Sequence, residues 1–133
     1  MTRKEERIQS FTLVFEKMFN PESSIELIVE NAAEADEIEV STFAKMLATA
    51  VYENIDKIDS LISKYSKNRG LDRTPKVSLA IMRLAVCEML YIESIPIGVS
   101  INEAVELAKT FATSDDASYI NGILGSISKE LNK

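Results

Sequence analysis

The chain has 133 residues, 46% of them hydrophobic and 27% charged, which predicts a folded domain and excludes a disordered or low-complexity chain. No apolar run is long enough to span a membrane, and the N-terminal residues lack the apolar core of a signal peptide, so we expect a cytoplasmic protein. Histidine is absent and Cys87 is the single cysteine, which excludes a histidine-based catalytic site and an imidazole or thiolate metal cage.

The net charge of −6 is unevenly distributed along the chain. Residues 20–60 are strongly acidic, whereas residues 61–83 are rich in lysine and arginine. An acidic protein can still carry a basic face, because association depends on the local potential as well as on the net charge. Two interpretations of the basic stretch stay open: a solvated loop, or a contact surface for a polyanion such as RNA.

Apolar residues recur every three or four positions along nearly the whole chain, which predicts an all-α protein. The first helix is expected over residues 3–19, because Thr2 and Glu5 have capping-box spacing in front of an apolar stripe. Arg3 and Lys4 occupy the first turn, where the helix dipole favours negative charge. Bases in this unfavourable position hint at a polyanion site.

A second helix is expected from Ser23 or Ser24 to about Ala35, because Glu26 follows Ser23 at capping-box spacing. The third apolar stripe covers residues 43–65 and predicts one long helix or two helices bent near Asn54. Such a stripe can form a coiled-coil seam or an intramolecular core. Short links between the helices favour the core.

The stretch SKNRGLDR is expected to be a loop in which Gly70 adopts a left-handed conformation, followed by a helix that starts at Thr74-Pro75. From Val77 to Ile92 nearly every residue is apolar, so this helix should be surrounded by protein on all sides. Arg83 and Glu88 interrupt it. Buried charges need partners, so we favour structural ion pairs over direct contacts to a ligand.

Ser100 and Glu103 form a capping box that should open a helix ending near Thr113, with Phe111 on its inner face. The last helix is expected from about Asp116 to Leu131.

Gly122 and Gly125 lie inside this last helix and destabilise it relative to alanine, so something should approach its backbone closely, either a neighbouring helix or a bound partner. Asp115-Asp116 is interpreted as helix N-terminal charge and not as a metal site. The link before Ser100 is too long for the turn of a DNA-reading helix-turn-helix.

The sequence IPIGVSINEAVELAKTFATSDDASYINGILGSI, residues 95–127, closely resembles the signature of the NusB family of transcription antitermination factors. Its distinctive features are the proline-led link, the string INEA and the Asn121-Gly122 pair after an aromatic and an aliphatic residue. Residues 77–88 match the central helix of the family. The resemblance therefore covers the C-terminal half well and the N-terminal half by its helix layout.

The resemblance implies two packed helical bundles of about three helices each, over about 1–68 and 69–133, which form a single RNA-binding domain. The implied role is non-enzymatic and requires no cofactor or metal. NusB proteins bind the boxA element of nascent ribosomal RNA transcripts jointly with the ribosomal protein NusE and help RNA polymerase to read through terminators. The expected partners are therefore boxA RNA, NusE and the RNA polymerase antitermination complex, without a membrane or DNA sequence reading.

The RNA-binding residues implied by the resemblance are Arg3, Lys4, Arg7, Phe15 and Tyr119. The three bases correspond to a basic N-terminal segment that contacts RNA in the family, and the two aromatics to ring positions near the same surface. Glu5 and Glu6 dilute the basic segment. Because three bases make few phosphate contacts, we expect a partner to supply further positive charge.

Two alternatives remain open at this point. The chain can be a helical protein–protein adaptor without RNA binding. It can also be an RNA-binding domain detached from an RNA cytosine methyltransferase, because the same domain occurs fused to such enzymes.

Overall fold

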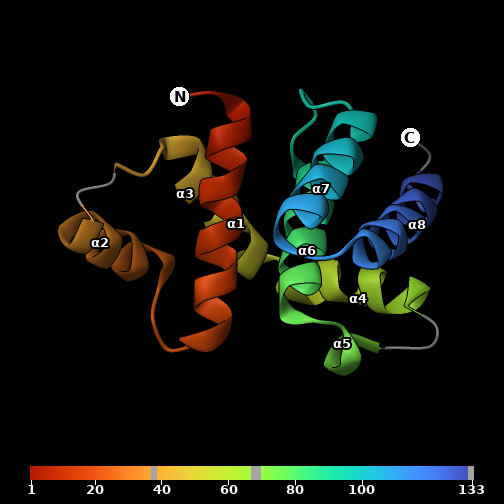
Figure 1. Ribbon diagram of the computed structural model, residues 1–133, viewed down its shortest axis with the longest axis horizontal. Helices are drawn as coiled ribbons and strands as arrows, with labels where there is room; N and C mark the ends of the chain where they lie inside the picture. The colour runs from red at the N-terminus through yellow and green to blue at the C-terminus, as the bar shows by residue number, and fades with distance from the viewer. Residues whose placement is uncertain (37–38, 67–69, 132–133) are drawn as a thin grey trace.

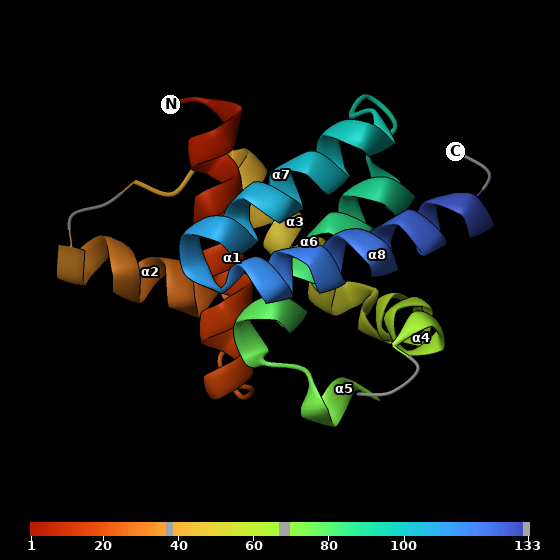
Figure 2. The ribbon, with the colours of Figure 1, turned by 45° about the vertical axis from the view of Figure 1, so that its right-hand side comes forward.

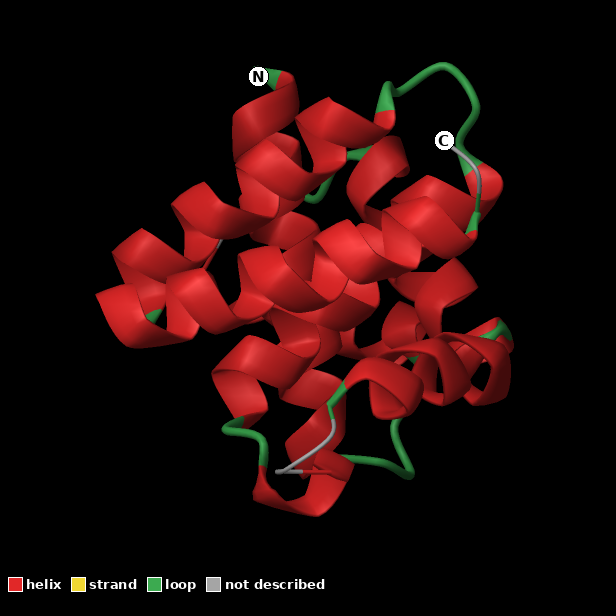
Figure 3. Cartoon of the chain, turned by 90° about the vertical axis from the view of Figure 1, so that its right-hand side faces the viewer, coloured by secondary structure: helices red, strands yellow, loops and turns green. Residues whose placement is uncertain are grey.

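The structure is a computed structural model that describes residues 1–36, 39–66 and 70–131. These residues form helices and no strand (Figure 3), so the all-α prediction is confirmed. The helices, in chain order, are α1 (Arg3–Phe19), α2 (Ile25–Asp36), α3 (Thr42–Glu53), α4 (Ile55–Tyr65), α5 (Gly70–Arg73), α6 (Lys76–Tyr91), α7 (Ile97–Phe111) and α8 (Ser114–Glu130).

The helices form two groups that meet on α6 (Figures 1 and 2). In the first group α1, α2 and α3 pack on one another, and in the second α4, α7 and α8 pack around α6. The two groups are joined because α1 and α3 also contact α6. The predicted pair of packed helical bundles is confirmed. Helix α4 precedes residue 68 in the sequence but packs mainly on α6 and α8.

Helix α6 is buried nearly all round, as its apolar sequence predicts. Its buried residues include Ile81, Met82 and Leu84, which are almost completely inaccessible to solvent. Full burial of one such side chain stabilises the fold by about 1.5–3 kcal/mol, so this helix is the main contributor to the common core. No helix in the described part of the chain is long and apolar enough to cross a membrane.

Local capping signals fix the start of α1. The Thr2 hydroxyl accepts a hydrogen bond from the Glu5 N–H at 3.1 Å, and the Glu5 carboxylate accepts one from the Thr2 N–H at 3.1 Å. The predicted bounds and the capping box of α1 are both confirmed. In α2 the predicted cap is off by one residue, because the Ser24 hydroxyl, not that of Ser23, accepts from the Leu27 N–H at 3.0 Å.

The long third stripe is two helices, broken at Asn54, whose side chain donates to the Ala50 carbonyl at 2.8 Å. Gly70 has a φ of 68°, so the left-handed conformation is confirmed. The predicted loop is wrong in part, because residues 70–73 form the short helix α5. Residues 67–69 of the same stretch lie outside the described residues.

Two predicted helix caps are wrong because the hydroxyl of the expected capping residue donates a hydrogen bond to another acceptor. Thr74 donates to the Gly70 carbonyl at 2.7 Å, and Pro75 precedes α6 without a side-chain cap. Ser100 lies inside α7, which begins earlier, at Ile97. Its hydroxyl donates to the Glu88 carboxylate at 3.0 Å.

The expectation that another helix approaches the backbone at Gly122 and Gly125 is wrong. Among the described residues, a Cβ atom on either glycine would meet no atom of a neighbouring helix within 4 Å. Phe111, expected on the inner face of α7, is 44% exposed. Helix α8 begins at Ser114, where the Thr113 hydroxyl accepts from the Asp116 N–H at 3.1 Å.

Candidate nucleic-acid interface

The first turn of α1 presents two exposed bases. The Arg3 guanidinium lies 3.6 Å from the centroid of the Phe43 ring in α3 and 3.8 Å from the Glu6 carboxylate. Lys4 lies on the other side of the turn, where it lines a narrow seam between α1 and α7 together with Glu106 and other residues. Both cations are therefore available to a ligand, and Arg3 is partly oriented by an aromatic ring.

Arg7, the third base of the segment, is buried at 5% exposure. Its Nε donates to Glu88 Oε2 at 3.0 Å and its Nη2 donates to Glu88 Oε1 at 3.1 Å. The Ser100 hydroxyl binds the same carboxylate. The structure therefore separates Arg7 from Arg3 and Lys4, because its guanidinium is already paired and lies beneath the surface.

Arg83 and Glu88, the two charged residues in the interior of α6, have the partners expected of buried ion pairs. Glu88 pairs with Arg7, and Arg83 forms a bidentate pair with Asp59 of α4, at 2.9 Å and 2.8 Å. The prediction of structural ion pairs is confirmed for both. Cys87, between them, is fully buried, and burial raises the pKa of its thiol to about 12, so it is an inert thiol.

A row of aromatic rings runs along α1 and continues onto α7. Phe11 lies 5.9 Å from Phe15 and 5.2 Å from Phe111, measured between ring centroids, and Phe15 lies 5.0 Å from Phe19. Phe15 is half-buried within the row, whereas Phe111 and Phe19 are 44% and 56% exposed. Exposed aromatic rings offer faces on which the nucleobases of RNA can stack.

Sequence reasoning missed the exposed ring of Phe111, because the helical pattern assigned it to the core. Tyr119 lies in α8, half-buried, in a helix that packs closely on α7. The structure places Lys4 and Phe111 on the same seam between α1 and α7. Arg3 lies against Phe43 of α3, and Phe15 lies about three helical turns further along α1. Tyr119 is contributed by the second group of helices.

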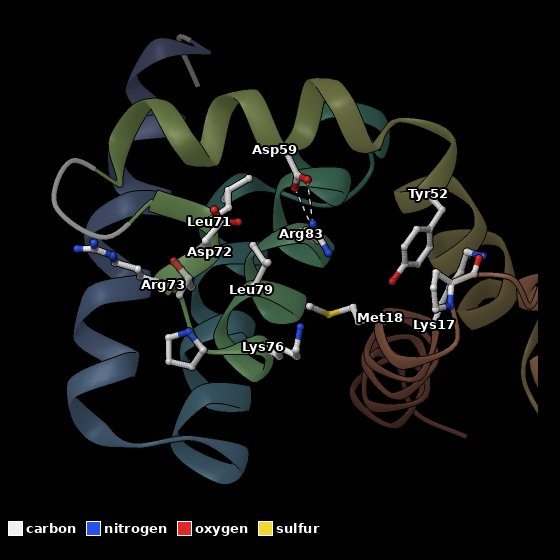
Figure 4. Close-up of a pocket in the computed structure, with 13 residues that line it drawn as sticks. Lys17, Met18, Tyr52, Asp59, Leu71, Asp72, Arg73, Lys76, Leu79 and Arg83 are labelled. Carbon is white, nitrogen blue, oxygen red and sulfur yellow. Dashed lines mark hydrogen bonds and ion pairs between the residues drawn. The ribbon is translucent and has the colours of Figure 1, made fainter.

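The basic stretch of residues 61–83 borders a groove of about 820 Å³ between the C-terminal end of α1, α3–α4 and α5–α6 (Figure 4). Most of the cationic side chains that line this groove already interact with other groups of the protein. Lys17 donates to the carbonyls of Pro21 and Ser23, Arg83 binds Asp59, and Lys76 lies 5.6 Å from the Phe19 ring centroid. Lys67 and Arg69 lie outside the described residues.

The groove also contains Tyr52, whose hydroxyl donates to the Val14 carbonyl. Burial raises the pKa of Tyr52 to about 12, so the side chain stays neutral at physiological pH. In the described part of the chain no group of three or more carboxylate or cysteine side chains is arranged to hold a metal ion. Neither feature indicates catalytic chemistry.

Helix α2, which carries part of the acidic stretch, lies apart from the first turn of α1 (Figure 1), whereas the Glu39 carbonyl accepts a hydrogen bond from the Gln9 side chain of α1 at 3.1 Å. Helix α2 projects from the first group of helices, away from α7 and α8 (Figures 1 and 2). Glu34 at its end and Glu39 after it are exposed, and Glu37 lies outside the described residues. The charge asymmetry of the sequence therefore separates an acidic end from the basic turn.

Comparison with known proteins adds independent findings. A family model described as "NusB family" matches residues 4–129. A transcription antitermination protein NusB of Natranaerobius thermophilus is 41% identical over 100% of this chain and 99% of its own length. That of Bacillus subtilis is 42% identical over 74% of this chain and 75% of its own length.

Solved structures with the same fold include T. maritima NusB, with a TM-score of 0.84 and 35% identity over 98% of this chain and 92% of that one. A chain of the structure titled "Crystal Structure of a Plectonemic RNA Supercoil" has a TM-score of 0.87 and 25% identity, over 98% of this chain and 96% of that one. A chain of the complex of antitermination factors NusB and NusE with dsRNA has a TM-score of 0.83 and 24% identity, over 98% and 99%, and shows the fold alone.

Proposed function

The chain belongs to the NusB family, and on this premise we propose that it is a transcription antitermination factor. It binds the boxA element of nascent ribosomal RNA together with the ribosomal protein NusE, and it promotes read-through by RNA polymerase. The proposal entails no catalysis and places the protein in the cytoplasm, where the transcript is made. A relative matched over 99% of its own length carries the antitermination name, which favours this role over a domain detached from a methyltransferase.

The observation that carries the proposal is that an exposed cation, Lys4, and an exposed ring, Phe111, meet at the seam between α1 and α7, with a second exposed cation, Arg3, on the same turn of α1. Arg3 and Lys4 are exposed at the first turn of α1, and Phe111 borders the seam that Lys4 lines. Arginine and lysine side chains neutralise phosphates, and aromatic rings stack on nucleobases. We assign Arg3 and Lys4 to phosphate contacts, and Phe15, Phe111 and Tyr119 to the aromatic part of the surface.

Arg7 has a different part in the proposed site, because Glu88 already neutralises it. Two exposed bases, with Glu106 also lining the seam, form a weak electrostatic site. Affinity for RNA therefore depends on positive charge that NusE brings to the joint surface. The protein alone should bind boxA RNA weakly.

Filter binding tests the proposal. The RNAs are a boxA oligonucleotide and a scrambled oligonucleotide of the same composition, each with the protein alone, NusE alone and both proteins together. We expect tight, boxA-selective retention only with both proteins. Binding of NusE without any gain in boxA retention would instead support the protein–protein adaptor, and equal retention of the scrambled RNA would contradict boxA recognition.

A further inference from the structure

The buried cluster of Arg7, Glu88 and Ser100 joins three helices at one point. Arg7 is in α1, Glu88 in the central helix α6 and Ser100 in α7. The guanidinium makes a two-point contact with the carboxylate, and the Ser100 hydroxyl donates to Glu88 Oε1 at 3.0 Å. Among the described residues, the cavity that Arg7, Glu88 and Ser100 line together has no room for a water molecule. The charges are therefore partnered by protein groups that come from both groups of helices.

Stability alone does not account for a charged cluster at this position. Removal of two charges from water has a large cost, and replacement of a buried ion pair by apolar side chains of similar volume is often neutral or stabilising. An apolar pair at positions 7 and 88 would fit the surrounding core residues Leu84 and Leu107. Contacts between apolar side chains, however, do not fix the relative orientation of the two helices. A guanidinium fork bound to a carboxylate fixes both distance and rotation.

Rotation of α1 matters for the proposed RNA site. Arg3 and Lys4 lie four and three residues before Arg7, so each is a helical neighbour of Arg7, one on either side of it. A turn of α1 about its axis moves Arg3 and Lys4 with Arg7. Lys4 and Arg7 also line the same seam as Phe111 of α7. The orientation of the pair therefore sets where the two cations lie relative to the aromatic surface of the second group of helices.

We infer that Arg7 is a positioning residue: its ion pair with Glu88 holds the first turn of α1 in register with α7 and α8, so that exposed cations and rings from the two groups form one RNA surface. This inference rests on the proposed function and adds to it. The arginine that the sequence assigns to RNA acts beneath the surface, through Arg3 and Lys4. Its contribution is the geometry of the site and not a phosphate contact.

The test compares Arg7→Met/Glu88→Met with Arg83→Met/Asp59→Met. Both double variants remove one bidentate ion pair of α6, but the second pair lies against α4, away from the seam. Spin labels on Thr12→Cys and Ser118→Cys, both exposed, report the distance between α1 and α8, and the buried native Cys87 stays unlabelled. The denaturation midpoint and the Kd for boxA RNA with NusE are measured on the same proteins without labels.

We expect Arg7→Met/Glu88→Met to keep a cooperative unfolding transition while its label distances broaden. Its Kd should rise by about tenfold, as expected for the loss of one or two charge-assisted hydrogen bonds to RNA. The control double variant should change neither the distance distribution nor the Kd. An unchanged distance distribution and Kd in the first variant would overturn the inference. An equal rise of the Kd in the control would also overturn it, because any ion pair of α6 would then have the same effect.

Two further variants distinguish positioning from a direct phosphate contact and cover the case in which the double variant does not fold. Glu88→Gln releases Arg7 without removing it: a direct phosphate contact would keep or tighten RNA binding, whereas positioning predicts weaker binding and broader distances. Should the double methionine variant fail to fold, Arg7→Lys keeps the charge without the fork, and unchanged label distances in it would overturn the inference. If the wild type does not bind boxA RNA, the proposed function fails, and the label distances alone decide on the positioning role.

Discussion

Gly122 and Gly70 differ in the backbone conformation that each residue adopts. A Cβ atom on either residue would meet no atom of another described segment within 4 Å. Gly122 lies in the regular helix α8, whereas Gly70 has a φ of 68°. An added methyl group therefore meets no steric obstacle at either position, but only the conformation at Gly70 is disfavoured for other residues.

We predict that Gly122→Ala raises the free energy of unfolding by about 0.5–1 kcal/mol, the usual helix-interior difference between the two residues. Gly70→Ala is the matched control and should lower it. Urea denaturation measures both. A lower stability for Gly122→Ala would show a close neighbour that the described residues do not contain.

The exposed cations and the ring of Tyr119 should contribute to RNA binding in ways that salt distinguishes. Arg3→Ala/Lys4→Ala should weaken NusE-assisted boxA binding and flatten the dependence of log K on log salt by roughly 0.7 for each phosphate that is no longer neutralised. Lys57→Ala/Lys129→Ala removes the same charge from exposed positions on other helices and should have little effect. Filter binding at several salt concentrations gives the slopes, and equal slopes for the two double variants would contradict the phosphate assignment.

Tyr119→Ala should behave differently from the removal of cations. Loss of base stacking costs about 1–3 kcal/mol of binding free energy and leaves the number of neutralised phosphates unchanged. The same titrations should therefore show a weaker Kd with the wild-type salt slope. A flattened slope in this variant would mean that the ring positions the cations and does not stack on a base.

At the scale of helices, local signals predicted the starts that depend on the chain nearby and failed where a distant group intervenes. The bounds of α1 follow from Thr2 and Glu5, which need no other part of the molecule. Ser100 has the same pattern, but Glu88 of another helix takes its hydroxyl and α7 starts earlier. The pairing of Arg7 has the same origin, because its partner lies 81 residues away in the sequence.

The sequence also could not predict whether another helix lies close to the glycines of α8. A glycine in a helix indicates either a close neighbour or an empty surface, and the pattern of the helix itself does not distinguish them. The break at Asn54 and the left-handed Gly70 were predictable because both depend on local geometry. For the candidate site, the RNA-binding residues stay a prediction, and the sequence did not show that Arg7 is buried while Arg3 and Lys4 are exposed.

Helices α4 and α8 are linked at their C-terminal ends by Lys64, Tyr65 and Glu130. The Lys64 ammonium and the Tyr65 hydroxyl both donate to the Glu130 carboxylate. These hydrogen bonds, that of Lys64 foremost, hold the pKa of Glu130 below its usual value of 4.5. A lowered carboxyl pKa in the folded state gives stability that is present above the ordinary pKa and is lost as the pH falls through the folded-state pKa.

We predict that Lys64→Met raises the pKa of Glu130 towards its ordinary value, and that Tyr65→Phe raises it less. Carboxyl chemical shifts of Glu130 followed by NMR between neutral and acidic pH measure both values. An unchanged pKa in Lys64→Met would show that the link between α4 and α8 does not persist in solution.

The whole molecule separates its charges and joins its two groups of helices at α6. Helix α2, with its exposed glutamates, lies on the far side of α1 from α7 and α8 (Figure 1). Salt screens exposed charges beyond about 10 Å at 0.1 M ionic strength. Glu30→Gln/Glu34→Gln, both in exposed positions on α2, should therefore change the boxA Kd only slightly, and a large gain in affinity would place the RNA near α2.

The central claim is that one RNA surface spans the seam between α1 and the α7–α8 pair. Titration of boxA RNA into the isotope-labelled protein bound to unlabelled NusE, followed by NMR amide and side-chain shifts, tests it most directly. Relative to the complex without RNA, we predict the largest changes at Arg3, Lys4, Phe111 and Tyr119, with few in α2. Changes confined to α2, or spread over the groove at Lys76 while the first turn of α1 stays unaffected, would contradict the claim.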